Sequence, residues 1–227
     1  MYFIGLIIDI LTHADFGLSP FGVVRLRQTI VQHERISLST EEKFDLTARL
    51  TEYRQTQKGI EFDIKFEMSN ERHVTVWESL GTFISRNKAT QKRQHQPRNQ
   101  QPLTADSIYA DEIRFDVAGN CGIEYAKISG DYNPYHLYPF TARLLGYPKP
   151  MAHGLWTATR SLVEIAVTKN LEPTRFVREL YVEFKRPLFI PSQVALRFGE
   201  TDSLVYSFRV ESAITGEPNL IAQAKFS

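Results

Sequence analysis

The segment FDIKFEM, residues 62–68, alternates apolar and polar side chains, and residues 73–80 (HVTVWESL) do so nearly as well. Alternation of this kind is typical of a β-strand that turns one face to the core and the other to solvent. An apolar helix is expected before these strands, over about residues 2–12. The strands predicted to follow it are 23–33, 43–53, 59–68 and 73–84.

The same order of elements returns in the second half of the chain. A strand at about 112–117 and a long loop come first, and an apolar helix at about 154–168 follows them. The strands predicted after that helix are 179–186, 193–200, 204–213 and 219–226. The two halves share this pattern but almost no sequence identity. A repeated pattern indicates two copies of one structural unit.

A long helix followed by antiparallel strands is stable when the sheet curls around the helix and buries it on all sides. The predicted fold class is therefore α+β, with two repeats of an antiparallel sheet wrapped around a central helix. The second repeat has a strand before its helix and the first repeat has none. We therefore expect the first repeat to lack its leading strand, with an open sheet edge and a partly uncovered helix. An open edge can pair with another chain, which favours a homodimer.

A polar, basic segment separates the two repeats. Residues 86–104 contain five basic residues, no acidic residue and two prolines, a composition typical of a solvated linker. The segment has no aromatic residues that could stack on bases, so nucleic-acid binding is not expected. The predicted domains are an incomplete N-terminal repeat at 1–85, a linker at 86–107 and a C-terminal repeat at 108–227.

Composition excludes several classes of protein. The 227 residues include 27 Lys and Arg against 26 Asp and Glu, and a net charge of +1 gives no overall attraction to nucleic acid or anionic lipid. Cys121 is the only cysteine, which excludes an internal disulfide and a cysteine-rich zinc site and fits a reducing compartment. The apolar run at 1–11 is interrupted by Asp9 and is too short to span a bilayer. A cytoplasmic protein that does not bind membranes is therefore expected.

The octapeptide SGDYNPYH, residues 129–136, holds the candidate chemistry. Its glycine and its Asn-Pro pair are turn residues, so Asp131 and His136 are expected in a rigid loop rather than on a helix or strand. Across such a turn a carboxylate and an imidazole can face one point, share a water molecule and exchange protons with a ligand. The same spacing also occurs in ordinary surface turns.

The tripeptide Ala152-His153-Gly154 leads into the second apolar helix. The start of a helix has unpaired N–H groups and a partial positive charge. A glycine there would let a ligand carbonyl approach the backbone, and its amide would hold negative charge developing on the carbonyl oxygen. His153 is either a structural residue at the helix start or a second polar contact for the ligand.

The combination of SGDYNPYH with AHG and an apolar helix resembles the MaoC-like, or (R)-specific enoyl-CoA hydratase (hydratase 2), family of hot-dog proteins. That family has the pattern Gly-Asp-x-Asn-Pro-aliphatic-His. The resemblance covers about residues 111–165, and the remaining elements follow the order found in double hot-dog members. The residues that it implies are Asp131 and His136 as the catalytic dyad, Gly154 as the amide that polarises the thioester oxygen, and Ser129, Asn133 and His153 as supporting residues. Tyr135 departs from the pattern, because the family has an aliphatic residue there.

The resemblance implies an (R)-specific 2-enoyl-CoA hydratase or 3-hydroxyacyl-thioester dehydratase, a hydro-lyase of fatty acid metabolism. The substrate would be an acyl thioester of CoA or of an acyl carrier, and no metal or redox cofactor is expected. The motif occurs once, so one active site per chain is expected. Four basic residues are candidates for contacts with the CoA phosphates: Arg143, Lys149, Lys185 and Arg186.

Three alternatives remain open. A hot-dog protein can bind acyl-CoA without turning it over. A hot-dog thioesterase would need a carboxylate on or near the central helix, where only Glu164 is available. A metal site built from Asp131, His136 and His153 would have two imidazoles and one carboxylate as ligands.

Overall fold

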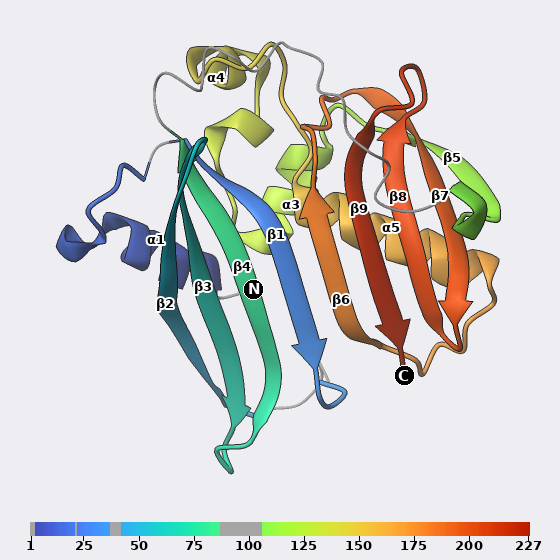
Figure 1. The fold of residues 1–227 in the computed structure, drawn as a ribbon, viewed down its shortest axis with the longest axis horizontal. Coiled ribbons are helices and arrows are strands. Elements are labelled where there is room, and N and C mark those ends of the chain that lie inside the picture. Colours follow the sequence, from blue (N-terminus) through green and yellow to red (C-terminus); the bar gives the residue numbers. More distant parts are fainter. Residues whose placement is uncertain (1–2, 21, 37–41, 87–105) are drawn as a thin grey trace. The chain divides into compact units, whose positions relative to one another are not determined.

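The computed structural model describes residues 3–20, 22–36, 42–86 and 106–227. Its chain divides into two compact units, an N-terminal unit (Tyr2–Ala105) and a C-terminal unit (Asp106–Ser227). Each unit has an antiparallel sheet with a helix against it (Figure 1). Most of the linker predicted at 86–107 lies outside the described residues.

The N-terminal unit has one α-helix, one short 3-10 helix and four strands. The elements are α1 (Phe3–Thr12), η1 (Ala14–Phe16), β1 (Val23–Gln32), β2 (Phe44–Thr56), β3 (Gly59–Asn70) and β4 (Thr75–Arg86). The strands lie in the order β2-β3-β4-β1, and each neighbouring pair is antiparallel. Among the described residues no strand pairs with the outer edge of β2, and a cavity of about 400 Å³ opens between β2 and α1.

The alternation read in the sequence sets the core of the N-terminal unit. Phe62, Ile64 and Phe66 on β3 are buried and pack with Ile7 of α1. Phe62 pairs with Phe83 of β4, and their rings stack with centroids 5.6 Å apart. The order and type of the predicted elements are confirmed in this unit, with boundaries shifted by up to three residues.

The C-terminal unit repeats this order with additional elements before its long helix. The elements are η2 (Asp106–Ile108), β5 (Asp111–Val117), α3 (Cys121–Ser129), η3 (Pro134–His136), α4 (Pro139–Leu144), α5 (Gly154–Thr168), β6 (Val177–Phe184), β7 (Ser192–Asp202), β8 (Val205–Ser212) and β9 (Pro218–Phe226). The strand order is β6-β9-β8-β7-β5, all antiparallel. Strand β5 lies beside β7, in the position that is open beside β2 of the N-terminal unit.

Two expectations about the helices are wrong. The segment between β5 and α5, expected as one long loop, contains α3 and α4. The residues that α3 buries include Gly122, Ala126 and Ser129, which are too small or too polar to give an apolar helical periodicity. The central helices are also not buried on all sides, because each is covered along one face. Ile8 of α1 is 52% exposed and Val167 of α5 is 67% exposed.

Helix α5 lies across one face of the strands of the C-terminal unit and buries a stripe of residues against them (Figure 1). Ala158, Leu162 and Ile165 have the three- and four-residue spacing of one helix face and are buried. This packing fixes the axis of α5 and therefore the position of its first turn, at Gly154. The candidate site is built around that turn.

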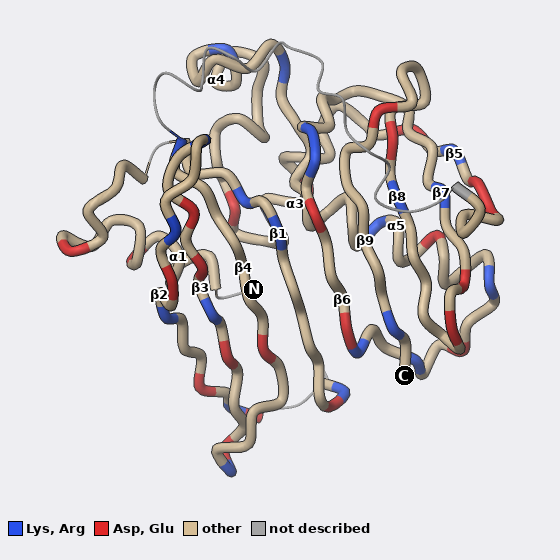
Figure 2. The backbone as a smooth tube through the Cα atoms, viewed as in Figure 1, with Lys and Arg blue, Asp and Glu red and all other residues tan. Residues whose placement is uncertain are grey.

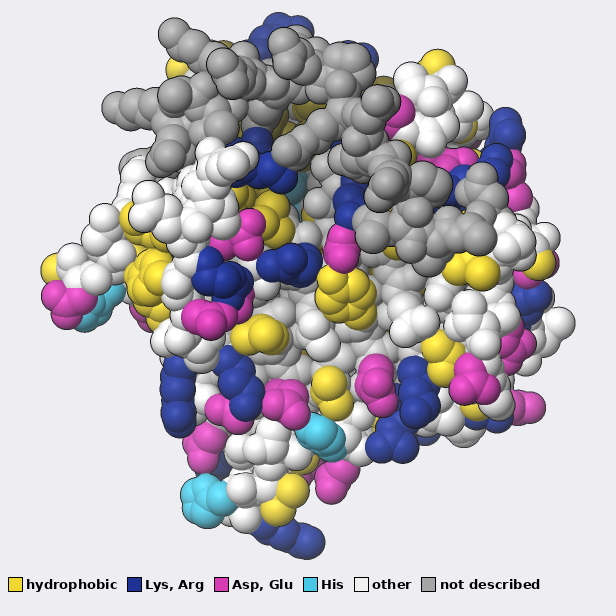
Figure 3. Space-filling model, viewed as in Figure 1, with side chains coloured by type: hydrophobic (Ala, Val, Ile, Leu, Met, Phe, Trp, Pro, Cys, Tyr) yellow, Lys and Arg dark blue, Asp and Glu magenta, His cyan; other side chains and the backbone are white. Residues whose placement is uncertain are grey.

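Charged residues of both signs are interspersed along the strands of each sheet (Figure 2). On the face seen in Figure 3, basic, acidic and isolated hydrophobic side chains mingle within each unit. No helix within the described ranges has both the length and the apolar character needed to cross a bilayer.

Candidate active site

The chain turns sharply where α3 ends. Gly130 caps the helix in the left-handed conformation, at φ +69°, which favours a residue without a Cβ. The Asp131 amide then donates to Oγ of the buried Ser129 at 3.1 Å, and the Asn133 amide donates to Asp131 Oδ1 at 3.2 Å. Ser129 and Asn133 therefore hold Asp131 from both sides, Asn133 through its main chain.

His136 ends the 3-10 helix η3, which corrects the expectation that it lies in a loop. Pro134 is the first residue of this turn, where its fixed φ suits a helix start. The His136 ring is only 6% exposed, and its Nδ1 lies 2.7 Å from the main-chain oxygen of Met151. A carbonyl oxygen only accepts hydrogen bonds, so Nδ1 carries the proton and Nε2 of the neutral ring has a free lone pair.

The environment keeps the His136 ring neutral. Burial is the largest cause that lowers the pKa of His136, and the charge that His153 can carry lowers it further, to about 4. The hydrogen bond to Met151 and the negative charge of Asp131 act in the opposite direction and are weaker. At neutral pH the ring is therefore a base with an available lone pair.

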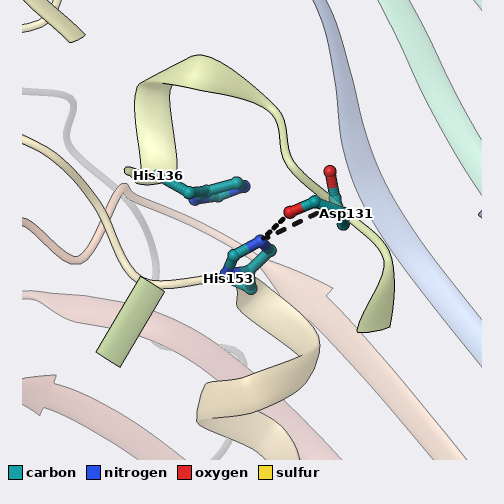
Figure 4. Close-up of side chains that lie close together, drawn as sticks. All are labelled: Asp131, His136 and His153. Atoms are coloured by element: carbon teal, nitrogen blue, oxygen red, sulfur yellow. Dashed lines mark hydrogen bonds and ion pairs between the residues drawn. The ribbon is translucent and has the colours of Figure 1, made fainter. Parts of the chain in front are cut away.

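His153 immediately precedes α5 and is 4% exposed. Its Nε2 lies 3.0 Å from the main-chain oxygen of Asp131 and 3.9 Å from Oδ2 of the same residue. Its ring also stacks on His136, with centroids 3.6 Å apart and planes at 23°. Figure 4 shows Asp131, His136 and His153 pointing toward one another from the turn after α3, the end of η3 and the residue before α5.

The structure thus brings together the carboxylate and the imidazole that the sequence singled out. A carboxylate oxygen of Asp131, a ring nitrogen of His136 and a ring nitrogen of His153 all lie within 4.8 Å of one another. A water molecule about 2.8 Å from each of two groups can bridge such a separation. The Asp131 side chain is 34% exposed, so the cluster is open to solvent at Asp131 and buried at the two rings.

The cluster is poorly arranged for a metal ion. Carboxylate and imidazole ligands suit a transition metal, but the lone pairs must converge on one point. The His136 and His153 rings are stacked with their planes at 23°, so their in-plane lone pairs lie in nearly parallel planes rather than in planes that cross at one point. A main-chain carbonyl also holds one nitrogen of each ring.

Gly154 is the first residue of α5, as the sequence predicts, and the structure shows a further reason for a glycine there. A Cβ at this position would lie 2.5 Å from Cε1 and 2.7 Å from Cδ1 of Phe184, at the end of β6. Such distances are far inside normal carbon contacts. The absent side chain therefore makes room for a phenyl ring of the protein.

Some residues of the site were missed in the sequence. Tyr125 of α3 packs against His153 with ring centroids 4.9 Å apart, and Met151 contributes only its carbonyl oxygen. Contacts made by the main chain, or by a ring one helix earlier, leave no sequence signal. Tyr135, the departure from the expected pattern, packs edge-on against His136 at 4.4 Å and against Tyr147 at 5.6 Å. It therefore shapes the packing behind the His136 ring.

The four basic candidates fall into two classes. Lys185 forms an ion pair with Glu183, and Arg186 forms one with Glu217 at 2.8 Å. Arg143 and Lys149 are exposed and form no ion pair with any residue of the described ranges. The second pair is therefore more available to an anionic ligand.

Comparison with known proteins gives a consistent result. Residues 88–217 match the family described as MaoC like domain. The chain is 25% identical over 227 residues to 3-hydroxyacyl-thioester dehydratase X of Mycobacterium tuberculosis, across 96% of this chain and 74% of that protein. A 31-residue stretch is 55% identical to the peroxisomal enoyl-CoA hydratase 2 of Arabidopsis thaliana, across 14% of this chain and 10% of that protein.

Solved structures show the same fold. The crystal structure of HtdX of Mycobacterium tuberculosis has a TM-score of 0.73 at 20% identity and covers 98% of this chain and 83% of its own. A MaoC-like dehydratase from Phytophthora capsici has a TM-score of 0.72 at 17% identity, with 90% and 72% covered. The fold is therefore α+β and hot-dog-like.

Proposed function

The chain belongs to the MaoC-like dehydratase family, and from that premise we propose that it is a hydro-lyase acting on acyl thioesters. The reaction is the reversible hydration of a trans-2-enoyl thioester to the (R)-3-hydroxyacyl thioester. The observation that carries the proposal is the convergence of Asp131 with a neutral, buried His136. A carboxylate and an imidazole within reach of one water molecule can supply general acid–base catalysis.

The geometry supports a specific division of work. The lone pair on Nε2 of His136 takes a proton from water as the water oxygen bonds to C3 of the enoyl group. The same proton then passes to C2, so that one water is added and the ring returns to its neutral form. Asp131 accepts the remaining hydrogen bond of the water and orients it. In this scheme the Gly154 amide donates to the thioester oxygen while that oxygen carries negative charge.

The test of this proposal is turnover of a short enoyl thioester. Asp131→Asn and His136→Gln should each lower kcat for crotonyl-CoA hydration by about 10²–10⁴, the range for acid–base groups. Asp116→Asn is the matched control, because Asp116 is an exposed carboxylate of β5 in the same unit and should leave kcat unchanged. Parental turnover in Asp131→Asn would refute the assignment. Binding without turnover by the parent chain would identify an acyl-thioester-binding protein instead.

The two units are proposed to form the two halves of a double hot-dog. Four strands of each unit correspond and lie in the same order, β2-β3-β4-β1 in the first unit and β7-β8-β9-β6 in the second. Only the C-terminal unit contains the motif. The proposed domains are the incomplete repeat at 1–85, the linker at 86–107 and the catalytic repeat at 108–227. A homodimer in the cytoplasm, acting in fatty acid metabolism, completes the proposal.

A thioesterase is disfavoured by the surroundings of Glu164. This residue is the only carboxylate on α5, and it forms an i,i+4 ion pair with Arg160. Glu164 follows Gly154 by ten residues, which places it about 15 Å along the helix from the candidate site at the first turn. Release of free thiol from an acyl-CoA would reverse this conclusion.

A further inference from the structure

We propose that His153 is a positioning residue, whose imidazole sets Asp131 and His136 over the start of α5. This inference rests on the proposed function, because it concerns how the same site is held in a productive geometry. His153 itself need not touch the substrate. Its effect is exerted through the two groups that do.

The side chain of His153 does not do what its position leads one to expect. A residue just before a helix commonly caps it with a side-chain acceptor for a free amide of the first turn. His153 makes no such bond to α5. Its Nε2 instead lies 3.0 Å from the main-chain oxygen of Asp131, which can only accept, so Nε2 carries a proton and donates. This bond fixes the backbone from which the Asp131 carboxylate projects.

The face of the same ring fixes the second group. His136 stacks on it at 3.6 Å, and Tyr125 of α3 packs against it at 4.9 Å. His153 also adjoins Gly154 in sequence. One buried ring therefore links the carboxylate, the base and the amide proposed to hold the thioester oxygen. A displacement of about 1 Å in such a constellation can cost about 10²-fold in rate.

Two substitutions separate the contributions of the ring. His153→Gln keeps an N–H donor near the carbonyl of Asp131 but loses the aromatic face. His153→Phe keeps an aromatic face for His136 but loses the donor. If the hydrogen bond positions Asp131, His153→Phe should lower kcat by about 10- to 100-fold with KM within about twofold of the parent. His153→Gln should recover part of that loss, because it restores the donor to the Asp131 carbonyl but not the aromatic face against His136.

Ser161→Ala is the matched control. Ser161 is fully buried on α5, and its Oγ donates to the Thr157 carbonyl at 2.9 Å, so the substitution removes a buried hydrogen bond away from the cluster. Its kcat should stay within about twofold of the parent. Urea unfolding of each variant is measured beside the kinetics, because a structural role alone would lower stability without a selective loss of kcat.

Three outcomes overturn the proposal. The first is a parental kcat in His153→Phe, and the second is an equal loss of kcat in the Phe and Gln variants. The third is a loss of kcat in each variant that matches the fraction of unfolded protein in the assay. An inactive parent chain would refute the proposed function but would leave this inference open to a structural test. That test is a crystal structure of the His153→Phe variant. The His153→Phe structure should show the Asp131 carboxylate displaced relative to the His136 ring. An unmoved carboxylate would overturn the positioning role whether or not the chain is active.

Discussion

Replacing Gly154 by alanine tests the contact between the first turn of α5 and β6. A Cβ at this position would lie between 2.5 and 3.2 Å from three ring atoms of Phe184, where carbon atoms normally stay about 3.5–4.0 Å apart. Phe184 is half-buried, so its ring must shift against its neighbours. Overpacking of this kind costs about 1–3 kcal/mol. Gly154→Ala should therefore lower the free energy of unfolding by that amount in urea titrations.

The matched variant is Phe184→Leu, which removes ring atoms from the space that the new methyl group needs. Because the new methyl group and the Phe184 ring compete for one space, the double variant should be more stable than the sum of the single effects predicts. Alanine at position 154 keeps the main-chain N–H that is proposed to bind the thioester oxygen. If the double variant recovers kcat, any loss of kcat in Gly154→Ala comes from packing and not from a missing donor. A Gly154→Ala chain as stable as the parent, or a double variant with additive effects, would refute the reasoning.

Two further predictions concern charge. Because the pKa of His136 is lowered to about 4, the fold should lose roughly 3 kcal/mol of stability as pH falls from 6.5 to 4, since the unfolded chain binds a proton in that range and the folded chain does not. His136→Gln should flatten the pH dependence of unfolding in that window; an unchanged slope contradicts it. Arg143→Ala and Lys149→Ala should raise KM for enoyl-CoA about twofold to fivefold, unlike Lys185→Ala and Arg186→Ala. If Arg143→Ala and Lys149→Ala raised KM for a phosphate-free pantetheine thioester as much as KM for enoyl-CoA, contact with the CoA phosphates would be contradicted.

Local sequence patterns predicted most of the secondary structure. Alternation around Phe62, Ile64 and Phe66 identified β3, and the apolar run from Gly154 identified α5, because each pattern follows directly from burial of one face. Helix α3 was missed because its buried side is made of Cys121, Gly122, Ala126 and Ser129. Such small residues allow close packing but carry little hydrophobic signal.

The site could be predicted only in part for a related reason. Asp131 and His136 are five residues apart, so turn chemistry alone could place them near each other. The ring of Phe184 reaches Gly154 from thirty residues away, a separation that no local sequence pattern spans. The contact of His136 with Met151 uses a carbonyl oxygen, which every residue type possesses. Neither contact leaves a pattern in the sequence.

That carbonyl has a consequence for how the site tolerates mutation. The hydrogen bond that selects the tautomer of His136 ends on the backbone of residue 151, so substitutions of the Met151 side chain leave its acceptor in place. Genetic drift at this position can alter packing without inverting the direction in which the imidazole presents its lone pair. The backbone conformation at residue 151, and not the identity of its side chain, therefore determines which nitrogen of His136 has the free lone pair.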